Sequence, residues 1–407
     1  MPEATTESVQ KKVTSSPTLS KKQSEFLDAV HAGKSVFLTG KAGTGKSYVV
    51  QEAIKSLKQQ RKNVVALAPT GVAANNIGGQ TVHSMFSLDP FGILTFEDCR
   101  FLKSEKRRMM GLIDTIFIDE VSMLRPDHLD AINWTLIKNG CKGLKDIQII
   151  FIGDLKQLPP PIDDNTKSIL FGTYEGCEFY NALICKKLDI QIIELDEVLR
   201  QSDPDFITAL NIVREGGKSE YFRQFVTKTP RGIILAPHNS TVQQYNVNGL
   251  AKLEGEEYVW DAVVTGNVKA GDFNLESQVR VKQGCRIMYL ANSQNNNLFN
   301  GTLGIFKVEE GNFFIDVNGV KYALEQIQVT KKEYVLNESQ DKLELREIGS
   351  ITQMPIKLAY ALSIHKSQGL TFDEITIDLT LPCFSKGQMY TALSRVKTPA
   401  GLSIITK

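Results

Sequence analysis

Residues 35–47 read SVFLTGKAGTGKS, a short apolar run followed by a segment rich in glycine. From Gly40 to Ser47 this segment matches the pattern G-x-x-x-x-G-K-[ST], and it lies between an expected strand and an expected helix. Glycines let the chain curl so that successive backbone N–H groups point at phosphate oxygens, and the start of a helix adds a positive field. The segment therefore predicts a phosphate-binding loop; a glycine-rich turn that binds nothing is the alternative.

In this loop Lys46 would reach the β- and γ-phosphates of a nucleotide, and the Ser47 hydroxyl would bind Mg²⁺. ATP and Mg²⁺ are accordingly the expected cofactors. The loop residues expected to contact them are Gly40, Ala42, Gly43, Thr44, Gly45, Lys46 and Ser47.

Short apolar strands alternate with helices on both sides of the loop. Helical patterns run from Ser20 through Ala29 and over Lys46–Gln60. Strands are expected at Ser35–Thr39, Asn63–Ala68, Asp114–Ile118, Ile147–Ile152, Ile192–Leu195 and Gly232–Ala236. Nearly continuous apolar strands between helices predict an α/β fold whose parallel sheet is covered on both faces.

Two carboxylates directly follow the apolar strand that ends at Ile118. Asp119 is placed to hold the Mg²⁺ shell, and Glu120 is placed to orient or activate an attacking water. Solvated acids at an ordinary strand end are the alternative.

Three further polar residues are candidates for the same site. Gln157 lies in GDLKQLPP after the strand Ile147–Ile152, where it could sense a γ-phosphate, although a structural turn is the alternative. Arg200 and Arg395 could each close the site from a neighbouring lobe and stabilise charge on the phosphate oxygens. Taken alone, each arginine is better explained as a surface residue of a helix.

The pattern changes between about residues 254 and 352. Strands there are short and alternating, and Asn300-Gly301 and Asn318-Gly319 are strong hairpin signals. We predict an antiparallel β insert, in the form of a small barrel. The α/β pattern then resumes with a strand at Glu374–Leu379, a helix at Phe384–Val396 and a strand at Leu402–Thr406.

Composition limits the class of protein. The 407 residues carry a net charge of +1, which argues against a polybasic tail protein but allows a local basic path for nucleic acid. The six cysteines form no C-x-x-C pair, and no segment has the length or apolar character of a spanning helix or secretory signal. Reduced cysteines predict an intracellular location, cytoplasmic in a bacterium and nuclear or mitochondrial only in a eukaryote.

Seven segments together resemble superfamily-one DNA helicases, and most closely the PIF (petite integration frequency) family. They are FLTGKAGTGKS, APTGVAANNIGGQTVHSMF, IFIDEVSML, IGDLKQLPP, LDEVLRQSDPDF, LSIHKSQGLTFD and GQMYTALSRV, and they extend over nearly the whole chain. RecD-like and phage Dda helicases share much of this pattern. One departure is Asp127–Gly143, which lacks the basic and Pro-Phe-Gly-Gly ending of the family's signature helix.

The resemblance implies two RecA-like P-loop domains with parallel sheets and ATP between them. After a flexible tail of residues 1–18, the first domain would span 19–196, with a small DNA-facing arm at 84–111. The second would comprise 197–253 and 353–407, and the β-barrel insert of Src-homology type would occupy 254–352.

The resemblance also assigns roles to residues. Gln23 matches a glutamine that reads the adenine edge, and Gln157 and Arg200 match γ-phosphate sensors. The residues that match the second lobe's contribution to the nucleotide site are Gln368, Gly369 and Arg395. Ala68–Phe86 and Ser363–Gly369 match segments that grip single-stranded DNA.

The residue types in these two segments suit a strand of DNA. Pro69, Thr70 and Gly71 follow a strand, so their backbone N–H groups and a hydroxyl would be exposed to backbone phosphates. Additional donors are His83, Lys366 and Ser367, with His365 a weaker candidate that could equally be structural. Phe86 could stack on a base, but a lone phenylalanine is more often part of a core.

Five basic residues, Arg100, Lys103, Lys106, Arg107 and Arg108, crowd the segment that the family places at the duplex junction. A solvated helix face explains them equally well.

The function expected from these features is ATP-dependent translocation on single-stranded DNA, implied by the resemblance to run 5′→3′, with unwinding of duplex DNA. Single-stranded and tailed or forked duplex DNA are the expected partners, without a membrane. A monomer is expected, because two RecA-like domains in one chain can work alone. A strand translocase that separates no duplex and a nucleotide-gated switch that binds proteins are the alternatives.

Overall fold

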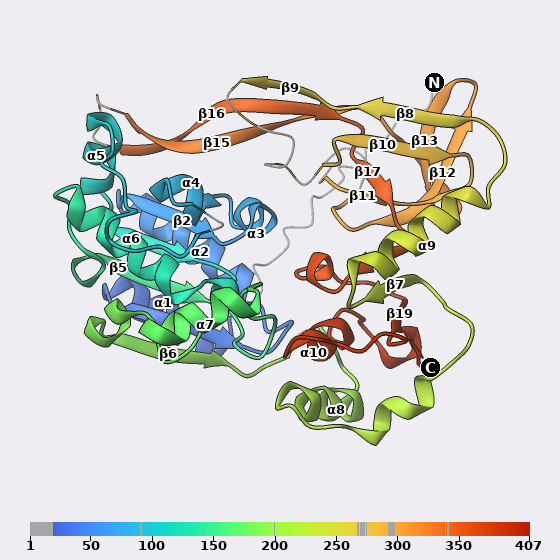
Figure 1. Ribbon diagram of the computed structural model, residues 1–407, viewed down its shortest axis with the longest axis horizontal. Coiled ribbons are helices and arrows are strands. Elements are labelled where there is room, and N and C mark those ends of the chain that lie inside the picture. Colours follow the sequence, from blue (N-terminus) through green and yellow to red (C-terminus); the bar gives the residue numbers. More distant parts are fainter. Residues whose placement is uncertain are drawn as a thin grey trace, which may run out of the picture.

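A computed structural model describes residues 19–407 except 90–91, 199, 267, 269–272, 274, 292–297, 338 and 340–341. Figure 1 shows two lobes side by side, joined across one edge by long strands. The predicted tail at residues 1–18 lies outside the described residues, and the predicted domain boundaries stay predictions. Within the described part of the chain, no helix has both the length and the apolar character needed to cross a bilayer.

The first lobe is built on a six-stranded parallel sheet of order β3-β2-β4-β5-β1-β6. Its strands are β1 Ser35–Gly40, β2 Val64–Ala68, β3 Gln80–Thr81, β4 Thr115–Ile118, β5 Gln148–Ile152 and β6 Ile190–Leu195. The helices are α1 Lys21–His31, α2 Lys46–Gln59, α3 Gly71–Asn76, α4 Val82–Phe86, α5 Ser104–Gly111, α6 Pro126–Lys138 and α7 Asp164–Thr173. Short 3₁₀ turns occupy Val121–Met123, Leu144–Asp146, Phe179–Asn181 and Leu183–Lys187.

Successive side chains of each strand point to opposite faces of the first sheet, and each face has its own apolar core. Val36 and Leu38 pack with α1 and α2 on one face, while Phe37 between them packs with α4, α5 and α6 on the other. Because both faces are covered, the strands read as continuous apolar runs, as expected for a buried parallel sheet.

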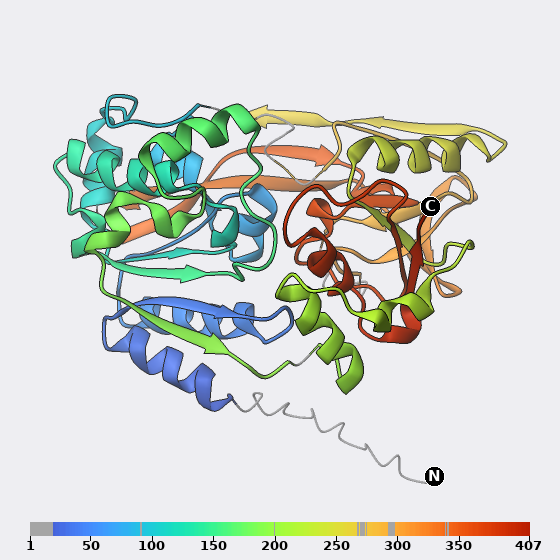
Figure 2. The same cartoon turned by 60° about the horizontal axis from the view of Figure 1, so that its bottom comes forward.

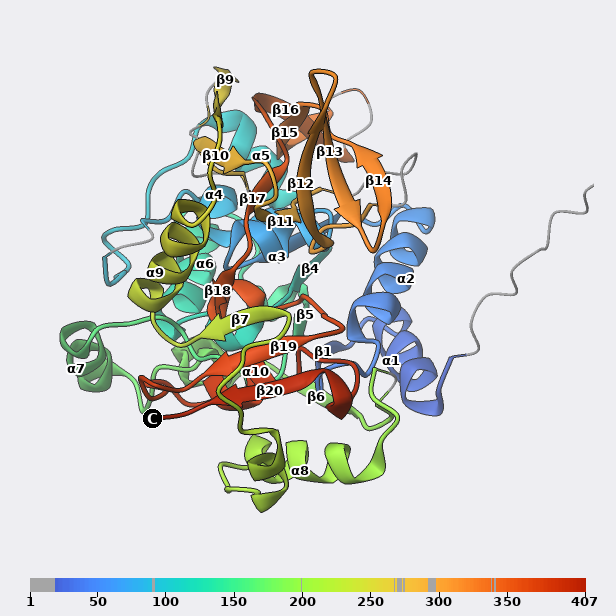
Figure 3. The same cartoon turned by 90° about the vertical axis from the view of Figure 1, so that its right-hand side faces the viewer.

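The second lobe has a four-stranded parallel sheet of order β18-β7-β19-β20, whose strands follow one another in Figure 3. These are β7 Ile233–Ala236, β18 Ala361–Ser363, β19 Ile375–Asp378 and β20 Leu402–Ile405. The helices are α8 Pro204–Arg214, α9 Asn239–Ala251 and α10 Gln388–Leu393, with 3₁₀ turns at Glu220–Phe225, His365–Ser367 and Pro399–Gly401. The helix predicted from Phe384 begins only at Gln388, because Gly387 before it is left-handed, with φ 75°.

The antiparallel barrel lies beside the second lobe. A pair formed by β8 Glu257–Asp261 and β10 Gln278–Lys282 packs with a five-stranded sheet around one apolar core. That sheet contains β11 Arg286–Tyr289, β12 Leu303–Glu309, β13 Asn312–Val317, β14 Val320–Ala323 and β17 Ile356–Leu358. The Asn318-Gly319 hairpin is confirmed, since Val317 pairs with Val320. Asn300-Gly301 also lies in a hairpin, since β11 and β12 pair antiparallel, but the connection there is longer than a two-residue turn.

A long β arm is the feature that the sequence reading missed. β15 Ile327–Asn337 and β16 Lys342–Gln353, with β9 Val263–Gly266 along one edge, leave the barrel and cross to the first lobe (Figures 1 and 2). Tyr334 and Leu336 of this arm are buried in the core beneath α4 and α5. Thus part of the predicted insert packs on the first lobe instead of forming barrel wall.

Tyr334 is the main polar anchor of the arm. Its hydroxyl accepts a hydrogen bond from the Ala66 backbone N–H at 3.0 Å, and its own N–H donates to Gln80 Oε1 at 2.8 Å. β3 pairs with Leu67 and Ala68 of β2 and does not reach Ala66. The Tyr334 hydroxyl therefore accepts the Ala66 N–H in place of a strand partner. Two further bonds, Ser84 Oγ to Glu333 and Leu343 N–H to Asn63 Oδ1, hold the arm beside it.

Substituting Tyr334→Phe should lower the free energy of unfolding by about 1–3 kcal/mol, because it leaves the buried Ala66 N–H without an acceptor. Urea unfolding measures this change. The control is Tyr180→Phe, which removes a hydroxyl from a half-exposed ring and should cost much less. Equal effects of the two substitutions would contradict the anchoring role.

Candidate functional site

The phosphate loop joins β1 to α2 and lies where the two lobes meet. Gly43 and Gly45 have φ values of 82° and 81°, which residues other than glycine rarely adopt. Gly45 is the N-cap of α2. A Cβ on Gly43 would come within 2.4 Å of the Arg200 Cβ. Glycine at this position therefore lets the arginine approach the loop.

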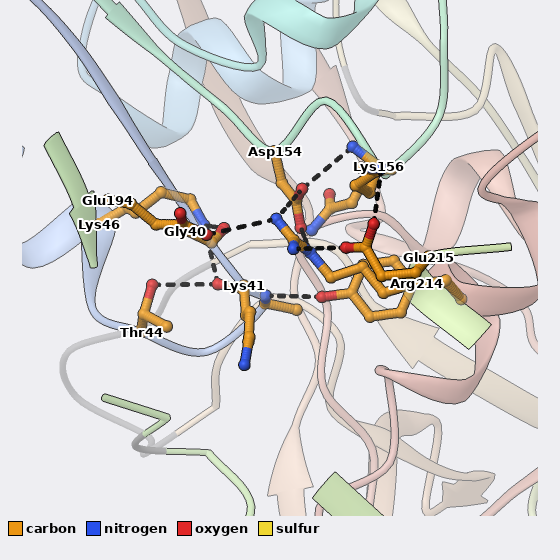
Figure 4. Close-up of polar contacts among 12 residues, drawn as sticks. Gly40, Lys41, Thr44, Lys46, Asp154, Lys156, Glu194, Arg214 and Glu215 are labelled. Atoms are coloured by element: carbon orange, nitrogen blue, oxygen red, sulfur yellow. Dashed lines mark hydrogen bonds and ion pairs between the residues drawn. The ribbon is translucent and has the colours of Figure 1, made fainter. Parts of the chain in front are cut away.

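Lys46 lies inside the curl of the loop. Its Nζ donates to the carbonyl oxygens of Gly40 and Lys41 at 2.7 and 2.9 Å (Figure 4). Burial lowers the pKa of Lys46, an effect opposed by the nearby carboxylates of Asp154 and Glu120. A polyphosphate would favour the charged lysine much more strongly than these carbonyl groups do.

Asp119 and Glu120 follow β4 and face the same cleft. Burial, followed by the charge of Glu120, raises the pKa of Asp119 to about 7, and burial also raises the pKa of Glu120. Glu120 has a φ of 48°, which is uncommon for a residue with a side chain, and its N–H donates to Asp119 Oδ1 at 2.8 Å. The strained turn directs both carboxylates into the cleft.

Gln368 connects the two lobes at this point. Its Nε2 donates to Glu120 Oε2 at 2.9 Å and approaches Gln157 Oε1 at 3.4 Å. The Gln368 Oε1 atom is buried without a hydrogen-bond partner among the described residues. Such an atom is suited to a donor supplied by a ligand or an ordered water.

Two arginines approach the cleft from its other side. Arg395 is only 2% exposed and donates to the backbone carbonyl of Thr391, while burial lowers its pKa to about 10. Arg200 donates to the Ser394 carbonyl at 3.1 Å, and burial lowers its pKa too. Neither is the ordinary surface arginine that its sequence context alone favoured.

With the exception of Gln368, these side chains line a cleft of about 380 Å³. Of the residues predicted for the nucleotide site, the cleft is lined by Ala42, Gly43, Thr44, Gly45, Lys46, Ser47, Asp119, Glu120, Gln157, Arg200, Gly369 and Arg395. Gln23 is not among the lining residues: it is the third residue of α1, and its Oε1 accepts the Ser20 N–H in a capping box.

The cleft fits a nucleoside triphosphate with Mg²⁺. The loop N–H groups, Lys46 and the arginines offer donors and positive charge to phosphates, while the Ser47 hydroxyl and the Asp119 carboxylate offer oxygen ligands. No cluster of three or more His, Cys, Asp or Glu side chains suited to a metal occurs in the part of the chain described. Mg²⁺ takes one or two protein ligands together with phosphates and water, and Ser47 and Asp119 would provide these ligands.

Polar contacts across the lobes surround the cleft, and the sequence reading did not identify them. Arg214 of α8 pairs with the buried Asp154 at 3.0 Å, and Lys156 pairs with Glu215 at 2.8 Å (Figure 4). The Tyr390 hydroxyl accepts the Ala42 N–H of the phosphate loop at 3.0 Å. Tyr390 lies in GQMYTALSRV, so that segment was the available signal.

The candidate DNA contacts of the first lobe are Pro69, Thr70 and Gly71 at the start of α3, and His83 and Phe86 in α4. Thr70 caps α3 by accepting the Ala73 N–H, with Pro69 before it and Gly71 after it, so these three lie at the carboxyl end of β2. His83 Nε2 lies 3.3 Å from His128 Nδ1, and burial lowers its pKa, which favours the neutral ring.

Phe86 is fully buried in the core of the first lobe. It cannot stack on a base in this conformation, and the alternative of a core residue fits.

In the second lobe His365, Lys366 and Ser367 form the 3₁₀ turn after β18. Lys366 is exposed and His365 half-buried. Ser367 is fully buried and its hydroxyl donates to the Ile364 carbonyl at 2.8 Å, so it holds the turn instead of facing solvent.

The five basic residues of the predicted arm also differ in their surroundings. Lys106 is half-buried, and its Nζ donates to Ser84 O and Ser87 Oγ, so it joins α5 to the end of α4. The other four side chains, Arg100, Lys103, Arg107 and Arg108, are exposed.

Comparison with known proteins decides the family. Residues 18–230 match the family described as PIF1-like helicase. This chain belongs to that family. It is 31% identical over 412 residues to the ATP-dependent DNA helicase Pif1 of Campylobacter jejuni, covering 93% of this chain and 90% of that protein. It is 32% identical to the zebrafish ATP-dependent DNA helicase PIF1 but spans only 61% of its length.

Solved structures of PIF1-like helicases have the same fold. Bacteroides Pif1 in complex with ADP-AlF4 superposes with a TM-score of 0.85 at 31% identity, covering 96% of this chain and 95% of that one. Bacteroides Pif1 bound to ssDNA superposes with a TM-score of 0.68 at 32% identity, covering 96% of this chain and 92% of that one.

Proposed function

We propose that the chain hydrolyses ATP in the cleft between its lobes and uses the resulting movement to unwind DNA. It is an ATP-dependent DNA helicase of the PIF1-like family. The observation that carries this proposal is that both lobes supply side chains to one cleft, as with Lys46 from one and Arg395 from the other. Occupation of the cleft would therefore change how the lobes lie relative to each other.

The proposed roles follow from chemistry. Lys46, Arg200 and Arg395 stabilise negative charge on the phosphates, and charge of this kind develops further during phosphoryl transfer. Ser47 and Asp119 would hold Mg²⁺, which neutralises phosphate charge when bound. Glu120 orients or deprotonates the attacking water, and Gln157 with Gln368 senses the terminal phosphate.

Single-stranded DNA is the proposed track. The Bacteroides relative has been crystallised with ssDNA, and the candidate contacts in this chain lie at the carboxyl ends of strands in both lobes. Nucleotide-dependent differences in how tightly each lobe holds the strand would turn opening and closing into directed steps. We propose 5′→3′ movement, as the family resemblance implies.

We further propose that the chain acts as a monomer, since one copy contains both walls of the cleft. An intracellular location is proposed because all six cysteines are free thiols and the substrate is DNA.

Two substitutions in the cleft separate binding from turnover. Lys46→Ala should abolish both ATPase activity and unwinding, because the phosphates lose their main cation. Glu120→Gln should retain ATP binding but lower turnover about 10²–10⁴-fold, because the amide cannot accept a proton from water. ATP binding is measured with a fluorescent analogue, turnover by phosphate release and unwinding by strand displacement.

The control for Glu120 is Glu175→Gln, an exposed acid of the first lobe that pairs with Lys186. It should leave turnover unchanged. Substantial turnover in the Glu120→Gln protein would remove Glu120 from the proposed role.

Charge reversal tests the basic surface near α5. Replacing the exposed Arg100, Lys103, Arg107 and Arg108 by Glu should weaken binding of forked DNA, more so at low salt, if this surface meets the junction. The matched control reverses four exposed basic residues in the second half of α2 and just after it, Lys55, Lys58, Arg61 and Lys62. Fluorescence anisotropy measures both proteins. Unchanged affinity of the first, or equal loss in the two, would favour a solvated helix face.

A further inference from the structure

Three rings meet on the second lobe, outside the nucleotide cleft. The Phe384 ring lies with its centroid 5.0 Å from that of His238 and 6.1 Å from that of His365. The His365 ring is nearly parallel to it, with an interplanar angle of 22°.

The topology of the sheet brings these rings together. His365 follows β18, His238 follows β7, and Phe384 lies in the segment after β19. The three strands are parallel neighbours, so their carboxyl ends share one edge of the sheet. The candidate DNA contacts at His365 and Lys366 lie on that same edge.

Phe384 is exposed although its loop is well held. The side chain is 64% exposed. Its N–H donates at 3.0 Å to Oε1 of Gln388, a fully buried residue, and His238 Nε2 lies 3.0 Å from the Pro382 carbonyl oxygen. The loop therefore holds an exposed aromatic ring at a fixed place.

We propose that Phe384, flanked by His365 and His238, is a stacking platform for one base of single-stranded DNA. This inference rests on the proposed function, since it assigns a further contact on the same track. Every base has a π-face, so stacking suits a motor that must pass any sequence. The exposed Lys366 and Lys386, close in sequence to two of the rings, supply positive charge for the adjacent backbone phosphates.

Abasic DNA separates stacking from charge. The Phe384→Ala protein should bind an oligo-dT strand about 5- to 150-fold more weakly than the unmodified chain. Its affinity for an abasic strand of the same length should change less than about twofold, because backbone contacts persist. Phe384→Leu should lose affinity as Phe384→Ala does, whereas Phe384→Trp should retain it.

A spectroscopic signature gives a second readout. The chain has two tryptophans, so Phe384→Trp adds an emission that oligo-dT should quench and the abasic strand should not. The control is Phe171→Trp on α7, where a comparably exposed ring lies in the first lobe and should respond to neither strand.

The outcomes distinguish this inference from the function on which it rests. If the unmodified chain binds oligo-dT but Phe384→Ala binds it equally well, or loses both strands alike, the platform is wrong and the DNA motor stands. If the unmodified chain binds no single strand, the proposed function fails with it. A Phe384→Ala defect confined to capture of a protein partner would also overturn the platform.

Discussion

The nucleotide cleft brings together charged side chains of both signs that are buried or half-buried. Burial lowers the pKa of Lys46 and Arg395 and raises that of Asp119 and Glu120, so it opposes the charged form of every one of these groups. Attraction between the opposite charges offsets only part of this effect of burial on their pKa values. The proposed triphosphate with Mg²⁺ would supply partners to the cations and to the carboxylates together, which would account for the convergence of charged side chains from distant segments on this cleft.

The lobes meet there through polar contacts and not through a shared core. In the described residues, the apolar clusters around the first sheet contain no residue of β7, β18, β19 or β20. Hydrogen bonds and ion pairs such as Arg214 to Asp154 can exchange partners as the cleft changes, whereas a packed core would resist. The β arm supplies the apolar link instead, through Tyr334 and Leu336. The proposed movement of the lobes would thereby be transmitted to the segment that leads to the candidate DNA contacts.

The sequence predicted the sheets and most of the cleft because their signals are local. Apolar runs define buried strands, and parallel strands gather the residues at their carboxyl ends, which places Lys46, Asp119 and Gln157 together. The β arm escaped because its alternating pattern suits a barrel strand equally well, and its partner on β2 is about 270 residues away along the chain. Gln23 follows Ser20 by three residues, which is the local spacing of a capping box, but the family resemblance pointed to an adenine contact instead. Phe86 is buried, as is usual for a lone phenylalanine.

Steady-state ATPase activity with and without single-stranded DNA, repeated across a range of salt, tests most directly whether the cleft and the DNA track are coupled. The coupling predicts stimulation of many-fold by DNA, fading as salt rises because phosphate contacts release counterions when they form. A rate that is the same with and without DNA at every salt concentration would contradict the account.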